Sequence, residues 1–430
     1  MNRRLFNAAA CVWVIAVSGS ASASKGEPQE VLENILRQAL RENPAVLAAR
    51  LEMEGADARA GSADRLPDPT LGVGYSPVAL ETRGGPQRAR ASIEQAFPFF
   101  GKRGLRREVA EAEAGIAGRR VDITASEVIG SVKDSFWEIY RVDRAIETAE
   151  KEAFLLAEIV EAADAKYATG SGQQSNLLQA QLMSTVVSNR LILLRGDRQA
   201  AVERLAGWVG APTEVPPLPE TDVLPLLLDR EEILARARDA SPEAAARRAE
   251  VRRARLAAAL VRKDFYPDFA LSLGWSEVGE NDMPGEWNGR DAWSVGAMVK
   301  IPLYRGDLRD REMGEEKSLE AAERRLDDAL LLVEANVDDL LRRLRAAAES
   351  IDLYRTGLIP QAMSTYESAM AAYSTGELGF ADLLVAERSL LEVELGRHET
   401  IARYEKMLSR LERVLGARDS ETLFPLRIGG

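Results

Sequence analysis

The sequence predicts a mainly α-helical protein with a membrane β-barrel component, built from two structural repeats that each run helix, strand, strand, long helix, turn, helix. Three observations lead to this expectation: a motif that occurs twice, a long ladder of apolar residues, and pairs of short alternating segments. The composition is typical of long helices, since Ala, Leu, Glu and Arg are abundant and aromatic residues make up only 6% of the 430 residues.

The repeat is most evident in two turn motifs. YATGSGQQSNLLQAQ begins at Tyr167 and YSTGELGFADLLVAE begins at Tyr373, which is an offset of 206 residues. Other pairs keep similar offsets: Pro44 and Pro242 (198), Pro67 and Pro267 (200), Pro98 and Pro302 (204), and Gly210 and Gly416 (206). Because the offset changes only in small steps, we expect two repeats of one architecture, at 24–210 and 229–416. A proline-rich linker at 211–228 joins them, and a tail at 417–430 follows.

The first 23 residues have the layout of an export signal. Arg3 and Arg4 provide the positive start, an apolar stretch follows, and Ala21-Ser22-Ala23 matches the small-residue cleavage pattern. The apolar run is too short to span a bilayer, so we expect cleavage after Ala23 rather than an anchoring helix. Cys11, the only cysteine, lies inside this stretch. The mature chain therefore has no thiol for a disulfide or for a Cys-ligated metal.

Four segments alternate between bulky apolar residues and small or polar ones, which is the period of a β-strand. We expect strands near 69–80 and 88–98 in the first repeat, and near 268–277 and 292–302 in the second. The small or polar set, which we expect to line a lumen, is Ser272, Gly274, Ser294, Gly296 and Met298, with Leu271, Leu273 and Val295 on the opposite face. The same alternation would also fit the half-buried sheet of a soluble sandwich.

Beyond the signal, the sequence shows no stretch that we expect to form a membrane helix. A chain without such helices can enter a bilayer only as a closed barrel, because lipid leaves unpaired backbone groups unsatisfied. Four strands cannot enclose a pore, whereas three copies of the chain would supply twelve.

An apolar ladder in the second repeat predicts a coiled-coil seam. It alternates steps of four and three residues through Leu330, Val333, Val337, Leu340, Leu344, Ala347, Ile351, Tyr354 and Leu358. A helix from Leu308 to Ser374 would contain 67 residues. At ~1.5 Å per residue such a helix would be about 100 Å long. We expect Pro360 to bend it.

Several function classes are disfavoured. The chain has 56 basic and 68 acidic residues, a net charge of −12, which argues against nucleic-acid binding. No P-loop, GxSxG or HExxH pattern occurs, so we expect no catalytic residue, no cofactor and no metal site. His398, the only histidine, is expected to be a solvated helix residue.

The order of these motifs resembles that of the TolC-type outer membrane factors, the outer membrane efflux protein family. The resemblance is carried by NPAVLAAR, LPDPTLGVGYS, QAFPFFGKRGLRREVAEAE, the two turn motifs and the closing LG. It implies a homotrimer with a twelve-stranded barrel among the lipids of the outer membrane of a Gram-negative bacterium, and an α-helical coiled-coil tunnel through the periplasm. It also implies a passive duct in a tripartite efflux pump, with a periplasmic adaptor and an inner-membrane transporter of the RND type.

In such a channel the two turn motifs would form hairpin tips at the periplasmic mouth. The resemblance assigns adaptor docking to Gly170, Ser175, Asn176, Leu177, Gly376, Glu377, Ala381, Asp382 and Leu383. Asp382 matches one acidic position of the family's gate, whereas Val385 stands where a second acid is often found.

The segment FPFFGKRGLR looks like members associated with heavy-metal-type pumps. The alternative to a channel is a periplasmic coiled-coil scaffold or adaptor that does not enter the membrane. The four strands with apolar faces favour the channel, and an enzyme is a distant third.

Overall fold

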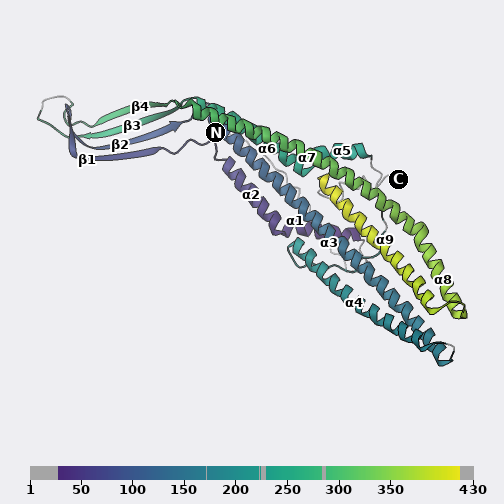
Figure 1. Ribbon diagram of the computed structural model, residues 1–430. Helices are drawn as coiled ribbons and strands as arrows, with labels where there is room; N and C mark the ends of the chain where they lie inside the picture. The colour runs from purple at the N-terminus through teal and green to yellow at the C-terminus, as the bar shows by residue number, and fades with distance from the viewer. Residues whose placement is uncertain (1–27, 171, 222, 224–228, 283–286, 417–430) are drawn as a thin grey trace, which may run out of the picture.

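The computed structural model describes residues 28–416, apart from residues 171, 222, 224–228 and 283–286. The molecule is elongated, with a small sheet at one end and two helical hairpin ends at the other (Figure 1). The expected signal at 1–23, with Cys11, and the expected tail at 417–430 lie outside the described residues.

The two halves of the chain contain matching series of elements. The first has α1 (Pro28–Glu42), α2 (Pro44–Ala60), β1 (Thr70–Thr82), β2 (Gly85–Phe97), α3 (Lys102–Ala168) and α4 (Gln174–Val209). The second has α5 (Arg230–Ala240), α6 (Pro242–Arg262), the 3₁₀ turn η1 (Lys263–Phe265), β3 (Asp268–Val278) and β4 (Ala292–Lys300). It continues with α7 (Arg305–Leu353), the π-helical turn η2 (Tyr354–Leu358), α8 (Ile359–Thr375) and α9 (Phe380–Val414).

Each half begins with two helices, although the sequence pattern predicted one. The break falls at Asn43-Pro44 and at Ser241-Pro242, where the proline stands at the first position of the second helix. Proline lacks the N–H that would continue the preceding helix, but it is well suited to start a new one. The Asn43 side chain accepts hydrogen bonds from the backbone N–H groups of Ala45 and Val46 in α2, and the Ser241 hydroxyl accepts one from the Ala244 N–H in α6.

A glycine at the end of each half packs on this helix corner. Gly210 and Gly416 have φ of +85° and +67°, a conformation that favours glycine. A Cβ at Gly210 would lie 3.0 Å from the Glu42 carbonyl oxygen, and one at Gly416 would lie 2.4 Å from the Ala240 carbonyl oxygen. The end of α4 therefore closes on the α1–α2 corner, and the end of α9 closes on the α5–α6 corner.

The four strands form one antiparallel sheet in the order β1-β2-β3-β4. The central pairing, β2 with β3, joins the two halves of the chain. β1 and β4 are its edges, so the sheet of a single chain is open (Figure 1).

The register separates the two faces of the sheet. One row across all four strands is apolar and consists of Leu71, Ile93, Leu273 and Val295. The next row, on the opposite face, consists of Gly72, Ser92, Gly274 and Ser294. The apolar face is uncovered in the single chain, since Val73 and Val295 are 81% and 83% exposed.

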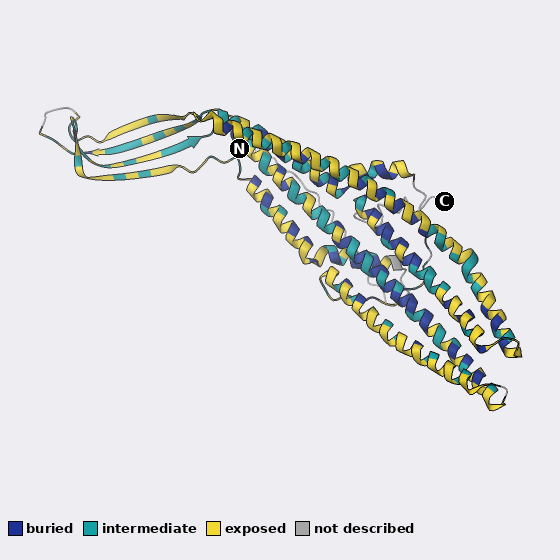
Figure 2. Ribbon diagram, in the orientation of Figure 1, coloured by how far each residue is buried: buried dark blue, intermediate teal, exposed yellow. Residues whose placement is uncertain are grey.

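The helices form a long bundle in which α3 lies between α4 and α9, while α7 and α8 pack along α9. Buried residues follow the inner faces of these helices (Figure 2). The predicted seam is confirmed over its middle, because Val333, Val337, Leu340, Leu344 and Ala347 are buried.

The long helix of the second repeat is interrupted near Pro360, as expected. The interruption is the π-helical turn η2, which ends two residues before the proline. Proline cannot donate to the carbonyl one turn earlier, and a wider turn is one way in which a helix accommodates this loss.

One further expectation needs correction. Among the described helices, α4 is long and apolar enough, by length and composition alone, to cross a membrane. α4 is packed against α3 in the bundle, and only a small part of its apolar surface is buried there.

Candidate functional site: the hairpin ends and the sheet

The two hairpin ends share one turn geometry. Gly376 ends α8 with φ of +84°, and its N–H donates to the Tyr373 carbonyl over 3.2 Å. Gly170 follows α3 with φ of +71°, and its N–H donates to the Tyr167 carbonyl over 3.0 Å. This left-handed glycine with a bond back to the last turn is a common way to end a helix. A Cβ at either glycine would meet no atom within 4 Å.

Most of the residues expected at the tips are on the surface. The exposed ones are Gly170, Ser175, Gly376, Glu377, Ala381 and Asp382, and the half-buried ones are Asn176 and Leu177. Leu383 differs, because it is fully buried in the apolar cluster that fills the hairpins. It stabilises the tip from inside and presents no surface to a partner.

The two tips contact each other within one chain. Lys166, in the last turn of α3, donates from Nζ to the Tyr373 carbonyl over 2.7 Å. The same Nζ lies 4.0 Å from the centre of the Tyr373 ring, a cation–π contact. The equivalent position in the second repeat is Ala372, so this link has no repeat-related counterpart.

This contact makes the two similar tips unequal. Tyr373 is 6% exposed, whereas its counterpart Tyr167 is 44% exposed. The first tip therefore presents an exposed tyrosine ring at its surface, whereas the corresponding ring of the second tip is covered.

The residues expected to line a lumen share one face of the sheet. Ser272 pairs with Gly296, Gly274 pairs with Ser294, and Met298 follows on the same face opposite Ala270. The register adds Arg90 and Glu94 to this face, because Arg90 pairs with Gly74 and Glu94 pairs with Thr70. The face is therefore small, polar and partly charged, in contrast to the apolar face behind it.

The model of the family described as "Outer membrane efflux protein" matches residues 35–211 and 233–417, which is most of the chain. The chain belongs to the outer membrane efflux protein family. It is therefore an outer membrane efflux protein, and this membership excludes the alternative of a periplasmic scaffold.

Individual relatives agree with this assignment. This efflux protein is 24% identical over 399 residues to the "Cobalt-zinc-cadmium resistance protein CzcC" of Cupriavidus metallidurans, covering 90% of each chain. It is 27% identical over 348 residues to the "Nickel and cobalt resistance protein CnrC" of the same organism, covering 76% of this chain and 75% of that one. Its fold matches the outer membrane protein VceC of Vibrio cholerae with a TM-score of 0.73 at 20% identity, over 90% of this chain and 96% of that one.

The junction between the sheet and the helices depends on a lysine to which the sequence analysis assigned no role. Lys102, the lysine of the FGKRG segment, is almost fully buried. Its Nζ lies 2.9 Å from Asp268 and 3.4 Å from Asp264. Asp268 also accepts a hydrogen bond from the Phe99 N–H over 2.8 Å. These contacts join the start of α3 to the start of β3, and so fix the sheet of the efflux protein to its helical part.

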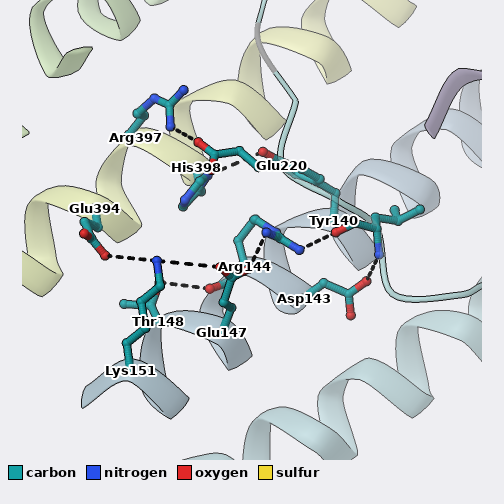
Figure 3. A network of polar contacts seen from close by, with 11 residues as sticks. Tyr140, Asp143, Arg144, Glu147, Thr148, Lys151, Glu220, Glu394, Arg397 and His398 are labelled. Atoms are coloured by element: carbon teal, nitrogen blue, oxygen red, sulfur yellow. Dashed lines mark hydrogen bonds and ion pairs between the residues drawn. The ribbon is translucent and has the colours of Figure 1, made fainter. Parts of the chain in front are cut away.

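A second polar network, which sequence reasoning missed, holds the linker (Figure 3). Asp143 of α3 accepts hydrogen bonds from the Leu218 N–H over 2.9 Å and from Arg198 Nε over 2.6 Å. Arg144 donates to the Leu218 carbonyl. Arg397 of α9 pairs with Glu220. The described part of the proline-rich linker is thus held against α3, α4 and α9.

His398 belongs to this network and is half-buried, where the sequence predicted a solvated residue. Its Nδ1 lies 3.4 Å from the Tyr140 hydroxyl (Figure 3). Burial lowers the pKa of His398 to about 4, so the ring is neutral near pH 7. Its place in the sequence, one residue after Arg397, carried no signal of this, because the partners come from a distant segment.

The described residues contain no group of three or more His, Cys, Asp or Glu side chains that could hold a metal ion. What the site offers is a set of surfaces: two hairpin ends, a polar sheet face and an apolar sheet face. Surfaces of this kind suit passage and assembly.

Proposed function

We propose that three copies of this chain form a passive duct through the outer membrane, the outlet of a tripartite efflux pump. The observation that carries the proposal is the open sheet with one uncovered apolar face and one polar face. Four strands with an even, antiparallel order leave β4 of one copy antiparallel to β1 of the next, so three copies can close a ring of twelve.

The two faces support one orientation of the sheet. Charged side chains on the lipid face of a barrel are destabilising, by about 2–4 kcal/mol for Arg or Lys at the bilayer midplane. Arg90 and Glu94 lie on the same face as Ser272 and Ser294. We therefore assign this face to the water-filled lumen and the row of Leu71, Ile93, Leu273 and Val295 to the lipid.

The helical part also carries uncovered apolar surface that a second copy would bury. On α4, Leu178 and Leu182 lie four residues apart and are mostly exposed. On the other side of the chain, Leu331 and Leu353 of α7 are exposed as well. In a ring of copies, α4 of one chain would pack against α7 and α8 of the next.

We infer that the hairpin ends dock a periplasmic adaptor, which connects the duct to an inner-membrane transporter of the RND type. The exposed turn residues Gly376, Glu377 and Ala381 and their counterparts in the first tip would form the contact. The acidic Asp382 lies exposed in the first turn of α9 and would contribute negative charge at the mouth.

Heavy-metal ions are the proposed cargo. The support is that the two relatives are named resistance proteins, one for cobalt, zinc and cadmium and the other for nickel and cobalt. Both are less than 30% identical to this chain, and a fold alone does not define a substrate. Growth on these metals, with and without the gene, tests the cargo directly.

A substitution pair at Gly376 tests the docking role. Gly376→Ala and Gly376→Trp share the strain of positive φ, but only Trp adds bulk, since nothing lies within 4 Å of a Cβ there. We expect Gly376→Ala to bind adaptor and export nearly as well as the original protein, and Gly376→Trp to lose adaptor pull-down. Full adaptor binding and export by Gly376→Trp would show that this tip does not dock.

Asp382→Ala should act differently. It removes charge at the mouth, so we expect altered ion selectivity or closed-state leak in planar bilayers while adaptor pull-down survives. An acidic residue in a first helical turn also stabilises the helix by roughly 0.3–1 kcal/mol. Asp382→Asn is the control, because it removes the charge but keeps the shape; only an electrical effect shared by both variants supports the role at the mouth.

A further inference from the structure

A groove of about 510 Å³ lies between the two hairpins, and α3, α4 and α9 line it. Its walls are mostly apolar, with Leu156 from α3, Met183, Val186 and Leu194 from α4, and Leu384 and Leu391 from α9. A volume of this size is in the range of pockets that hold drug-sized molecules, about 300–1,000 Å³.

One carboxylate in this groove is unusual. Glu387, about two turns into α9, lines the groove and is only 4% exposed. Its Oε1 has no hydrogen-bond partner among the described residues. A buried carboxylate without partners is costly in its charged form, and such a group needs a hydrogen bond or a counter-charge.

The other charges around the groove are already compensated. Each lining arginine has an acidic partner: Arg190 with Glu152, Arg388 with Glu392, and Arg141 with Glu138. From α8, the group that faces Glu387 is the Tyr366 phenol, whose own pKa is raised by burial and by the nearby charges of Glu158 and Glu387. When Glu387 is ionised, its Oε1 therefore has no hydrogen-bond partner among the described residues, and the two arginines that act on its charge, Arg190 and Arg388, are each paired with another carboxylate.

The chemistry of the groove selects the class of ligand. A metal ion would need several donors, and the described residues offer no group of three or more candidate ligands here or elsewhere. The apolar walls instead suit the body of an organic molecule, and the lone carboxylate suits one positive charge.

We propose that this groove binds a monovalent organic cation, with its apolar body between α3, α4 and α9 and its charge against Glu387. The site lies within one chain and away from the sheet. The inference does not rest on the proposed export function, because it is tested by binding alone.

Proton binding should compete with this ligand. Burial raises the pKa of Glu387 to about 7, against the opposing effect of Arg190 and Arg388. The cation pairs with the ionised carboxylate, so its affinity should be high above pH 7 and should fall as Glu387 takes up a proton.

The test uses two probes of one shape and opposite charge, tetraphenylphosphonium and tetraphenylborate. Binding to the full chain in non-ionic detergent is measured by equilibrium dialysis at pH 8 and pH 6. We expect the phosphonium to bind, with affinity lower by roughly tenfold at pH 6, because a group with a pKa near 7 is about nine-tenths ionised at pH 8 and one-tenth at pH 6. The probe keeps its charge throughout, so the pH dependence belongs to the protein.

Two variants locate the effect. Glu387→Gln resembles the protonated side chain, so it should fold normally, lose phosphonium binding by at least tenfold and lose the pH dependence. Glu203→Gln, which removes an exposed carboxylate of α4 outside the groove, should bind as the original protein does. A third variant, Val186→Trp, should fill the groove from its exposed wall and reduce binding without any change in charge.

The proposal fails if the phosphonium does not bind, if the borate binds equally well, or if Glu387→Gln keeps the original affinity. It also fails if Val186→Trp binds normally, since the ligand would then lie elsewhere. Thermal unfolding provides a second measurement on the same proteins. A raised carboxyl pKa means that stability falls as pH rises from about 4.5 to about 7, and Glu387→Gln should remove this part of the pH dependence. Identical pH profiles for the two proteins would contradict the unpaired buried carboxylate itself.

Discussion

Two glycines of the second repeat show how single residues act in this chain. Gly376 and Gly416 both have positive φ, +84° and +67°. Around Gly376 there is open space, whereas a Cβ at Gly416 would lie 2.4 Å from the Ala240 carbonyl oxygen. The first glycine serves only the backbone turn. The second also permits close packing of one helix end against a helix corner.

Alanine at these positions should therefore have different costs. Gly376→Ala should lower the free energy of unfolding by about 1 kcal/mol, the usual strain of positive φ. Gly416→Ala should cost on the order of 1–3 kcal/mol more, because the backbone must also move to relieve the overlap. Thermal unfolding followed by circular dichroism measures both. Gly196→Ala, inside α4 with no atom within 4 Å, should stabilise slightly and serves as the control. Equal losses at Gly376 and Gly416 would show that packing at the corner is unimportant.

Glu138 shows how one carboxylate joins two helices. It accepts hydrogen bonds from Arg141 on its own helix, α3, and from Lys406 of α9 over 2.6 Å. Burial alone would raise the pKa of Glu138, but the bonds from Arg141 and Lys406 outweigh it and lower the pKa to about 2. The ionised form is thus the one that stabilises the contact between α3 and α9.

This gives a pH dependence with a definite sign. A lowered carboxyl pKa contributes stability that is fully present above the ordinary value of 4.5 and is lost as pH falls through about 2. We expect Glu138→Gln to unfold at a lower temperature than the original protein at pH 7, and the gap to narrow below pH 4.5. Glu203→Gln, an exposed residue of α4, is the control. A gap that stays constant down to pH 2 would rule out the ionic contribution of Glu138.

At the scale of elements, the two faces of the sheet differ in the size and polarity of their side chains. Cross-strand pairs place serine beside glycine on one face, and a Cβ at Gly274 or Gly296 would lie 2.6 or 2.7 Å from the Oγ of Ser294 or Ser272. The glycines therefore leave room for the serine side chains. On the other face, apolar side chains stand opposite one another across all four strands.

Cysteine scanning should distinguish the faces. Ser272→Cys, Ser294→Cys and Met298→Cys should react with small charged thiol reagents in assembled protein, because we assign that face to water. Leu271→Cys and Val295→Cys should be protected by lipid. The glycine positions are poor sites for the scan because a side chain would crowd the neighbouring serine. Reversed labelling would mean that the two faces are inverted.

One contact between the two hairpin ends breaks the symmetry of the repeat. Lys166 links α3 to Tyr373 of α8, and the repeat offers no equivalent lysine for Tyr167. The two tips of one chain are thereby held as a unit, while Tyr167 remains available. Three copies would present six similar corners of two kinds.

At the scale of the whole molecule, the open sheet has two edge strands, β1 and β4, that other copies of the chain would pair with. A sheet with unpaired edges exposes backbone N–H and C=O groups that lipid cannot satisfy. Closing the ring with three copies removes both edges of every chain, and the exposed apolar surface of α4 and α7 would be buried by the same step.

Native mass measurement in detergent should accordingly give three chains. Truncating the edge strand β1 should abolish the trimer, because the ring would lose a pairing at each junction between copies. Truncating the N-terminal helix α1 is the control, since it leaves the sheet complete. A stable monomer that keeps its full strand content would contradict the trimer proposal.

The sequence by itself determined the features that depend on neighbouring residues. Period-two alternation located the four strands, the heptad ladder located the seam of α7, and the glycines at 170 and 376 located the two turns, because φ preference and side-chain direction are local properties. The Asn43-Pro44 and Ser241-Pro242 breaks were equally local, but their meaning as helix starts was overlooked.

Only the tertiary structure decided which of these residues face a partner and which face one another. Leu383 and its tip neighbours look alike in sequence, yet Leu383 is buried because helices α3, α4 and α8 converge on it. Glu387 and Lys102 look like ordinary residues of charged helices, and they are buried by segments that lie far away in the chain. Burial and charge compensation are sums over everything that packs around a group, so they follow from the arrangement of the helices and not from the local pattern.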